Sequence, residues 1–313
     1  MSLNYLSTEP GQVHGEPVEP RPSLTRPAGL ISIGTNSTRA LVAQLEPTPS
    51  ILLARSIGTR IGEGLKESGA LQEAAMQRTL DAIAEHVKAV RELTSDVRAI
   101  ATSALRRASN AEEFAARVKA ITGAVLDIIS GEEEARCSYA GAISGLPADA
   151  SYGVLDVGGG SVEYAIENTY VSCEIGAVRL TERFASLQGI ASSDDMREAR
   201  ELARAALQPL RAVQSVDELV AVGGSATTAC AVIAGERSDE PYMPLERDRL
   251  GSLIELLASL PLEQRKQLPA MPAQRADILL AGAIILDEAC AAAGHSKAIV
   301  SANDLLLGYL LRS

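Results

Sequence analysis

Val154–Ile166, with the sequence VLDVGGGSVEYAI, decides the fold because it repeats an earlier stretch, Leu30–Val42, with the sequence LISIGTNSTRALV. Both stretches carry an apolar run, a small polar or acidic residue, a tetrapeptide that begins with Gly and ends with Ser, and a second apolar run, all in one register. This pattern predicts a strand, a tight turn and an antiparallel return strand. The two copies predict two related halves of the chain.

Glycine-rich turns of this kind suit an anion. Glycine permits positive φ angles and a close approach of the backbone, so that consecutive N–H groups can converge on a phosphate. A third turn, Gly223-Gly224-Ser225, follows another apolar stretch, and we expect the first two turns to face each other across a cleft. The candidate phosphate-binding residues in the first two turns are Gly34, Thr35, Asn36, Ser37, Gly158, Gly159, Gly160 and Ser161.

Composition excludes several classes of protein. A net charge of −11 over 313 residues disfavours a protein that coats nucleic acid or an anionic membrane. The longest apolar stretch, 278–286, falls far short of the roughly 20 residues that cross a bilayer. The four cysteines and three histidines are scattered, which predicts neither disulfides nor a zinc site and favours a reducing cytoplasm. The proline-rich residues 1–27 lack the apolar core of a signal peptide, so we expect a disordered tail there.

The rest of the chain alternates between strand and helix patterns, and from Gly153 the order of these patterns begins again. We therefore predict an α/β protein with two domains of similar topology, 28–146 and 147–299, and a ligand cleft between them. A last helix within 300–313 is expected to pack back on the first domain. The main predicted elements between the hairpins are strands at 51–55, 97–101 and 125–129, a helix through 76–90 and a helix that begins at Asn110.

The chain resembles the superfamily of actin-like proteins, sugar kinases and heat-shock ATPases, and within it the exopolyphosphatase/guanosine pentaphosphate phosphohydrolase (Ppx/GppA) family. The element Ser130-Gly131-Glu132-Glu133-Glu134-Ala135 separates this family from the kinases and chaperones. The resemblance implies two actin-like (ribonuclease-H-like) domains, in the short form without further C-terminal helical domains. It also rests on the three glycine turns and on 101–106, 176–182, 275–277 and 300–301.

Hydrolysis of a phosphoanhydride needs a positioned water, a base, and positive charge on the phosphoryl oxygens. The resemblance makes Glu134 the candidate base. Ser130 and Glu133 form a capping box, and the helix dipole favours Glu132, so those acids have a structural explanation. On a helix, Glu134 shares a face with Ser138 and can point toward an open cleft.

Asp156 and Glu163 flank the second glycine turn and are candidate catalytic residues and Mg²⁺ ligands. The resemblance implies that Arg106 grips phosphate. Ser32 occupies the position that mirrors Asp156, where the family has Asp. Serine keeps an oxygen for the metal but loses the charge, and Mg²⁺ prefers carboxylates and water to a neutral hydroxyl.

The resemblance therefore implies a Mg²⁺-dependent exopolyphosphatase that releases the terminal phosphate of inorganic polyphosphate. Two alternatives stay open at this point. One is a guanosine pentaphosphate 5'-phosphohydrolase of the stringent response, and the other, motivated by Ser32, is a weakly catalytic protein that binds polyphosphate or an alarmone and regulates. A cytoplasmic location and a homodimer are also expected, with no nucleic-acid or membrane partner.

Overall fold

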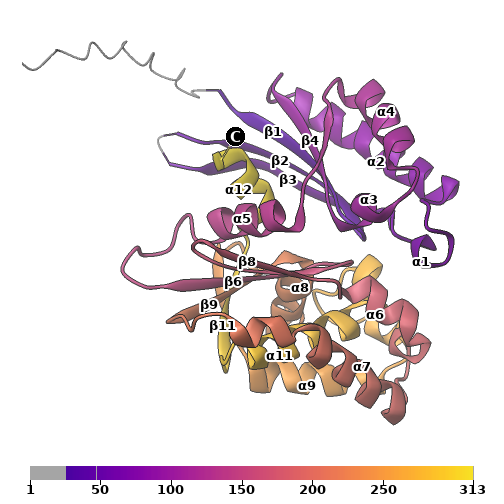
Figure 1. The fold of residues 1–313 in the computed structure, drawn as a ribbon, viewed down its shortest axis with the longest axis vertical. Coiled ribbons are helices and arrows are strands. Elements are labelled where there is room, and N and C mark those ends of the chain that lie inside the picture. The colour runs from indigo at the N-terminus through magenta and orange to yellow at the C-terminus, as the bar shows by residue number, and fades with distance from the viewer. Residues whose placement is uncertain (1–25, 47, 313) are drawn as a thin grey trace, which may run out of the picture.

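The computed structural model describes residues 26–46 and 48–312, and no account is given of the side chains of residues 66 and 67. The expected disordered tail therefore lies, up to residue 25, outside the described residues. The structure has two α/β lobes, each built on its own sheet, and one lobe lies above the other along the long axis (Figure 1). Within the described ranges, no helix combines the length and the apolar character that crossing a bilayer requires.

The first sheet has five strands in the order β3-β2-β1-β4-β5. The repeated hairpin forms β1 and β2, which pair antiparallel, and β4 runs parallel to β1 on its other side. The strands are β1 (Ala28–Ile33), β2 (Ser37–Gln44), β3 (Ser50–Gly58), β4 (Val97–Ala101) and β5 (Leu126–Ile128).

Alternate residues of β1 face opposite sides of this sheet, as the pleat requires. Ile31 and Ile33 pack with α2 (Glu73–Arg91) and α4 (Ala111–Thr122). Leu30 packs with α12 (Leu305–Arg312) on the other face, so the helix predicted near the end of the chain does cover the first sheet. The short helices on this side of the molecule are α1 (Leu65–Ser68) and α3 (Ser103–Arg107).

The second sheet has six strands in the order β10-β11-β9-β6-β7-β8. Its core is buried around α11 (Leu279–Ala292), which is apolar apart from Asp287 and Glu288, and these two acids form ion pairs with Arg200, Arg204 and Arg247. The strands are β6 (Tyr152–Val157), β7 (Val162–Ile166), β8 (Thr169–Cys173), β9 (Glu218–Val222), β10 (Tyr242–Glu246) and β11 (Lys297–Ser301). The other helices are α6 (Ala177–Arg183), α7 (Ser193–Ala206), α8 (Gly223–Ala234), α9 (Arg247–Ser259) and α10 (Leu262–Arg265), with three 3₁₀ turns at 185–188, 208–212 and 273–275.

The two sheets share a topology, which confirms the predicted fold class. The order β8-β7-β6-β9-β11 repeats β3-β2-β1-β4-β5, with β10 added at the edge of the second sheet. One prediction was wrong: the third glycine turn is not a separate turn. The helix α8 begins at Gly223 itself, whose φ of 85° favours glycine, directly after β9.

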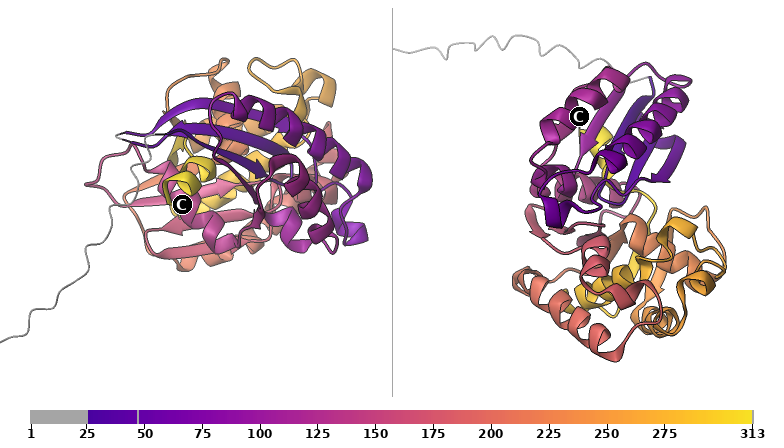
Figure 2. Two further views of the ribbon diagram at one scale, coloured as in Figure 1. Left: turned by 90° about the horizontal axis from the view of Figure 1, so that it is seen from above. Right: turned by 90° about the vertical axis from the view of Figure 1, so that its right-hand side faces the viewer.

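Helix α5 (Gly131–Ala142) lies between the sheets and packs against both of them (Figures 1 and 2). It also contacts α12 at two glycines. A Cβ atom on Gly141 would overlap the carbonyl oxygen of Asp304, and one on Gly308 would overlap the carbonyl oxygen of Cys137. The backbones of α5 and α12 therefore touch, and α12 fixes the position of the helix that carries Glu134.

Candidate active site

The two repeated hairpins have the same turn geometry. Gly34 N donates to Ser37 O at 3.0 Å, and Gly158 N donates to Ser161 O at the same distance. The sequence repeat therefore predicted the local structure correctly. Ser32 of β1 lies opposite Arg39 of β2. At the equivalent position of the second hairpin, Asp156 of β6 lies opposite Glu163 of β7.

The two glycine turns face each other, as predicted, and the surrounding chain holds them there. Asn36 O accepts hydrogen bonds from two backbone N–H groups that follow β3. The carbonyl oxygens of Gly158 and Gly159 accept from the first turn of α6. A Cβ on Gly159 would lie 3.3 Å from Asn36 Cβ, so the turns are in contact across the cleft.

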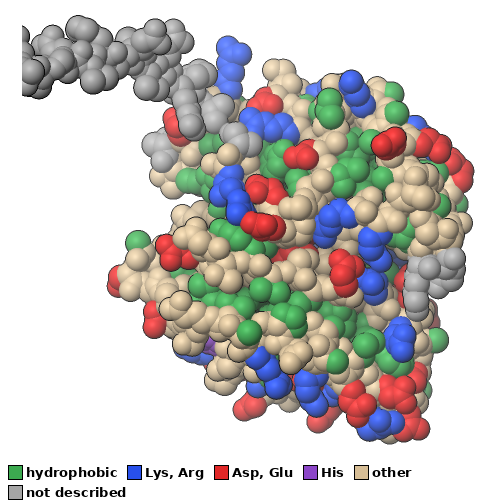
Figure 3. Space-filling model, in the orientation of Figure 1, with side chains coloured by type: hydrophobic (Ala, Val, Ile, Leu, Met, Phe, Trp, Pro, Cys, Tyr) green, Lys and Arg blue, Asp and Glu red, His purple; other side chains and the backbone are tan. Residues whose placement is uncertain are grey.

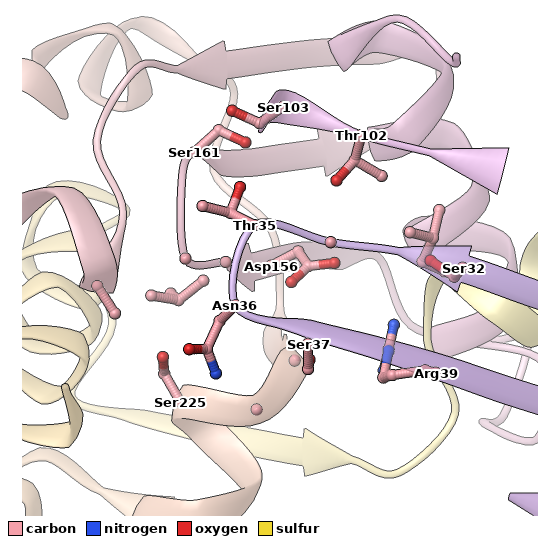
Figure 4. Close-up of a pocket in the computed structure, with 18 of the residues that line it drawn as sticks. Ser32, Thr35, Asn36, Ser37, Arg39, Thr102, Ser103, Asp156, Ser161 and Ser225 are labelled. Carbon is pink, nitrogen blue, oxygen red and sulfur yellow. The ribbon is translucent and has the colours of Figure 1, made fainter. Parts of the chain in front are cut away.

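A narrow cavity of about 80 Å³ lies between the hairpins (Figure 4). Arg106, Glu163 and Gly160, all within the described ranges, are the predicted site residues that do not line it. Gly160 instead packs against Thr35 and Ser103. The predicted residues that line the cavity are Ser32, Gly34, Thr35, Asn36, Ser37, Glu134, Asp156, Gly158, Gly159, Ser161, Gly223, Gly224 and Ser225.

Two polar side chains in the cavity wall have no hydrogen-bond partner among the described residues. They are Asn36, at both amide atoms, and Ser103, at its hydroxyl. In Figure 4 the Asn36 amide points into the cavity, toward Ser225. A buried polar group left unpaired costs about 1–3 kcal/mol. These groups are therefore suited to a polar ligand that would pair with them.

Glu134 sits in the cavity wall with 7% of its surface exposed. The pKa of this carboxyl is raised to about 7, because burial and, less strongly, the charge of Asp156 raise it more than Arg106 and a hydrogen bond with Thr102 lower it. A carboxylate of this pKa can take a proton near neutral pH. The helix places Glu134 where the sequence predicted, on the face that also carries Ser138.

Arg106 contacts the candidate base. Its Nη1 donates to Glu134 Oε2 at 2.6 Å and to the backbone oxygen of Ile129 at 3.0 Å, and its Nη2 lies 3.9 Å from Glu163 Oε1. These contacts hold Glu134 in place. That Arg106 also grips phosphate stays a prediction.

The two acids of the second hairpin have different surroundings. Asp156 Oδ2 accepts a hydrogen bond of 2.8 Å from Ser138, and burial together with the charge of Asp304 raises the pKa of Asp156 to about 6. Glu163 accepts from Ser172 at 3.0 Å, and burial and the nearby Glu134 raise its pKa well above the ordinary value. Three carboxyls thus share a small volume, and a cation or phosphate-bound metal would relieve their repulsion.

The oxygen-bearing side chains of the cavity decide whether it could hold Mg²⁺. Within the described ranges, no group of three His, Cys, Asp or Glu side chains is arranged to hold an ion. Mg²⁺ does not need such a group, because it usually keeps several waters and is held by one or two carboxylates plus substrate phosphates. Asp156 lines the cavity and fits this requirement. The Ser32 hydroxyl also lines the cavity as a neutral oxygen, whereas Glu163 lies outside the lining.

Sequence reasoning missed two arginines of the cavity. Arg39 lines it from β2, at the position equivalent to Glu163, and its place in the repeat is the signal that would have found it. Arg275 passes directly over the start of α8, where a Cβ on Gly224 would overlap its guanidinium. Burial and, less strongly, the charge of Arg39 together lower the pKa of Arg275 to about 10. Residues 275–277 contributed to the resemblance but were given no role.

A second cavity, of about 470 Å³, adjoins the first and shares Arg39, Gly223, Gly224 and Arg275 with it. Arg55 and Arg237 also line it. The surface on the side of Figure 3 mixes acidic and basic side chains, in contrast to the second cavity, where arginine is the main charged residue. A chain of phosphates in the first cavity would find further positive charge in the second.

Comparison with known proteins shows the family of the chain. A model of the Ppx/GppA phosphatase family matches residues 41–312. Exopolyphosphatase 2 of Mycobacterium tuberculosis is 32% identical over 92% of this chain and 98% of its own. The bifunctional 3-dehydroquinate synthase/phosphatase of Fusobacterium nucleatum is 29% identical over 90% of this chain, which spans 46% of that relative's length.

A crystal structure of the Aquifex aeolicus member of the Ppx/GppA family has a TM-score of 0.76 to this structure. The two chains are 30% identical, and the match covers 92% of this chain and 97% of that one. The overall arrangement of the two sheets therefore has a counterpart in a related protein. The chain belongs to the Ppx/GppA phosphatase family.

Proposed function

We propose that the protein is an exopolyphosphatase, which hydrolyses the terminal phosphoanhydride bond of inorganic polyphosphate. The observation that carries this proposal is Glu134, a buried carboxyl with a pKa of about 7 in the wall of a cavity that two glycine turns enclose. Members of the Ppx/GppA family are phosphoanhydride hydrolases.

In the proposed reaction, the terminal phosphoryl group lies between the two glycine turns. Glu134 accepts a proton from a water molecule as the water oxygen bonds to phosphorus, and the bond to the bridging oxygen breaks. The shortened chain leaves with the electron pair of that bond, and inorganic phosphate is released. Asp156, with the Ser32 oxygen near it, would hold Mg²⁺, which neutralises charge on the phosphoryl oxygens when bound.

The second cavity supports polyphosphate over guanosine pentaphosphate. Asp304 is the one carboxylate among the described residues that line it, and it is paired with Arg39. The lining named from the described residues also lacks an aromatic side chain on which a base would stack. Arginine suits a chain of phosphates because its guanidinium pairs with their oxygens in a bidentate way.

The test is the release of phosphate from long-chain polyphosphate, guanosine pentaphosphate and ATP, each assayed with Mg²⁺ and with EDTA. We expect fastest release from polyphosphate, and loss of release in EDTA. Glu134→Gln is the matched control, because it removes the base and keeps the shape of the side chain. Binding of polyphosphate without any hydrolysis would favour a regulatory binding protein. Faster release from guanosine pentaphosphate would favour a guanosine pentaphosphate 5'-phosphohydrolase.

Three further expectations belong to this proposal and rest on the sequence. They are the Mg²⁺ dependence, the cytoplasmic location and the homodimer. The assay above tests the first of them. Sedimentation of the purified protein would test the dimer.

A further inference from the structure

The two hairpins differ in charge although they share a backbone geometry. The second hairpin pairs two acids, Asp156 with Glu163, whereas the first pairs a neutral residue with a base, Ser32 with Arg39. Ser32 is 3% exposed, so the position that holds the carboxylate of Asp156 in the second hairpin is buried and neutral in the first. The first hairpin thus presents a partly buried guanidinium with no acid of its own across the ladder.

The acid comes instead from α12, far along the chain. Asp304 Oδ2 forms an ion pair with Arg39 Nη1. Asp304 Oδ1 accepts from the backbone N–H of Leu306 at 3.0 Å and caps the helix. The two side chains of the ion pair are 27% and 12% exposed, so water screens them only in part.

The position of Asp304 is fixed by backbone contacts. Gly308 N donates to Asp304 O at 3.0 Å, and the same oxygen lies against Gly141 of α5. These contacts fix the backbone of Asp304, and the Leu306 N–H holds its carboxylate in turn. A rigid acid of this kind can define where its partner points.

Arg39 needs such a partner because it lines both cavities together with Arg275. The two guanidinium groups repel each other, as the lowered pKa of Arg275 indicates. Without an acid, Arg39 would turn away from Arg275 whenever no phosphate is bound between them. Figure 4 shows Arg39 on the same side of the cavity as Ser32.

We propose that Asp304 is the positioning residue for Arg39, and that it supplies from α12 the carboxylate that Ser32 cannot supply from β1. The catalytic part of this inference rests on the proposed function, whereas the ordering of Arg39 does not. Removing the carboxylate leaves Arg39 mobile and out of place when charge develops on the phosphoryl group, which lowers kcat more than it raises KM.

A purely structural role for Asp304, as the cap of α12, predicts something different. Asparagine caps helices about as well as aspartate. Asp304→Asn therefore keeps the cap and removes the charge. A cap-only role predicts wild-type kinetics for this variant.

The decisive comparison is among the wild type, Asp304→Asn, and the double variant Ser32→Asp/Asp304→Asn, which moves the carboxylate to the cross-strand neighbour of Arg39. Asp127→Asn is the matched control, because Asp127 also tethers α12, through the Tyr309 hydroxyl at 3.1 Å, outside both cavities. With polyphosphate, we expect kcat to fall about tenfold in Asp304→Asn with KM within about twofold, and the double variant to recover most of the loss. The control should match the wild type.

An NMR measurement without substrate separates failure of this inference from failure of the proposed function. The side-chain Nε–Hε signal of Arg39, assigned by its loss in Arg39→Lys, reports how ordered the guanidinium is. We expect an ordered signal in the wild type, an averaged one in Asp304→Asn and an ordered one again in the double variant. An unchanged signal and an unchanged kcat in Asp304→Asn would overturn the inference, as would a loss that Ser32→Asp does not reverse. A wild type that hydrolyses no polyphosphate would refute the proposed function, and the NMR signals would still decide the role of Asp304.

Discussion

Arg106 Nη1 donates a hydrogen bond of 2.6 Å to Glu134 Oε2, and this contact joins α3, the short helix after β4, to α5, the helix between the sheets. The pair sets both the position and the proton affinity of the candidate base, because the positive charge of Arg106 opposes the effect of burial on Glu134. The two residues are 28 positions apart in the chain.

Glu134→Gln is expected to lower kcat by roughly 10²–10⁴ with little change in KM. The amide keeps the size of the side chain and its contact with Arg106, and it cannot accept the proton of the attacking water. Steady-state phosphate release from polyphosphate measures both constants. A kcat within about twofold of the wild type would show that Glu134 is not the base.

The pH dependence follows from the same carboxyl. Glu134 works as a base only when deprotonated, so kcat is expected to rise with pH through a limb near 7, its pKa in the folded protein. This raised pKa also contributes stability that is full below the ordinary value of 4.5 and is lost as pH rises through 7. Melting temperatures between pH 5 and 8 should therefore fall more for the wild type than for Glu134→Gln. Equal slopes would contradict the raised pKa.

Arg106→Ala is expected to move the pH limb of kcat to higher pH, because the charge that lowers the pKa of Glu134 is gone. If Arg106 grips phosphate as well, KM should rise and activity should become more sensitive to salt. A pH–rate profile at two ionic strengths separates these effects. Arg107→Ala is a suitable control, since Arg107 neighbours Arg106 and contacts Glu174 at 4.0 Å rather than Glu134.

Ser32→Asp in the wild-type background is expected to lower the Mg²⁺ concentration for half-maximal activity. A hard cation gains a charged oxygen in a partly desolvated site near Asp156. Titration of activity with Mg²⁺ gives this concentration. If metal dependence does not change, or activity disappears, Ser32 is not a vacant ligand position, and the added charge repels the substrate instead.

Gly308→Ala is expected to destabilise the protein by about 1–3 kcal/mol, since the added Cβ overlaps the carbonyl oxygen of Cys137 on α5. Thermal or urea unfolding measures the change. Gly251→Ala, in α9, is the matched control, because a Cβ there meets no atom within 4 Å. Equal stability of the two variants would mean that α5 and α12 can separate at little cost.

Most of the architecture could be predicted from local patterns. The strands at 97–101 and the helix through 76–90 appear as β4 and α2, because each rests on an apolar period that one buried face enforces. The start of a helix at Asn110 was also correct, although the Asn110 side chain does not cap α4. Its Oδ1 accepts from Leu71 N at 2.8 Å instead, a tertiary contact that no local pattern contains.

The site was predictable where the repeat defines it and not elsewhere. The glycine turns and Asp156 were found because their spacing recurs, and Glu134 because its motif is specific. Arg275 and Asp304 come from single copies, in stretches with no counterpart in the first half of the chain. Their place in the cavities depends on how α12 and the 273–275 turn pack, which is a long-range property. The expected domain limits at 146 and 299 stay a prediction.

The contact between Arg39 and Asp304 spans 265 positions of the chain, from the first hairpin to the last helix that the structure describes. A growing polypeptide makes β1 and β2 early and both β11 and α12 late, so the first sheet can form before α5 has its partner helix. Contacts of such long range form late in folding because their loops are costly to close. Hydrolytic competence is therefore expected to arise in one final step of folding, after the secondary structure is complete, so that unfinished chains do not degrade phosphoanhydrides.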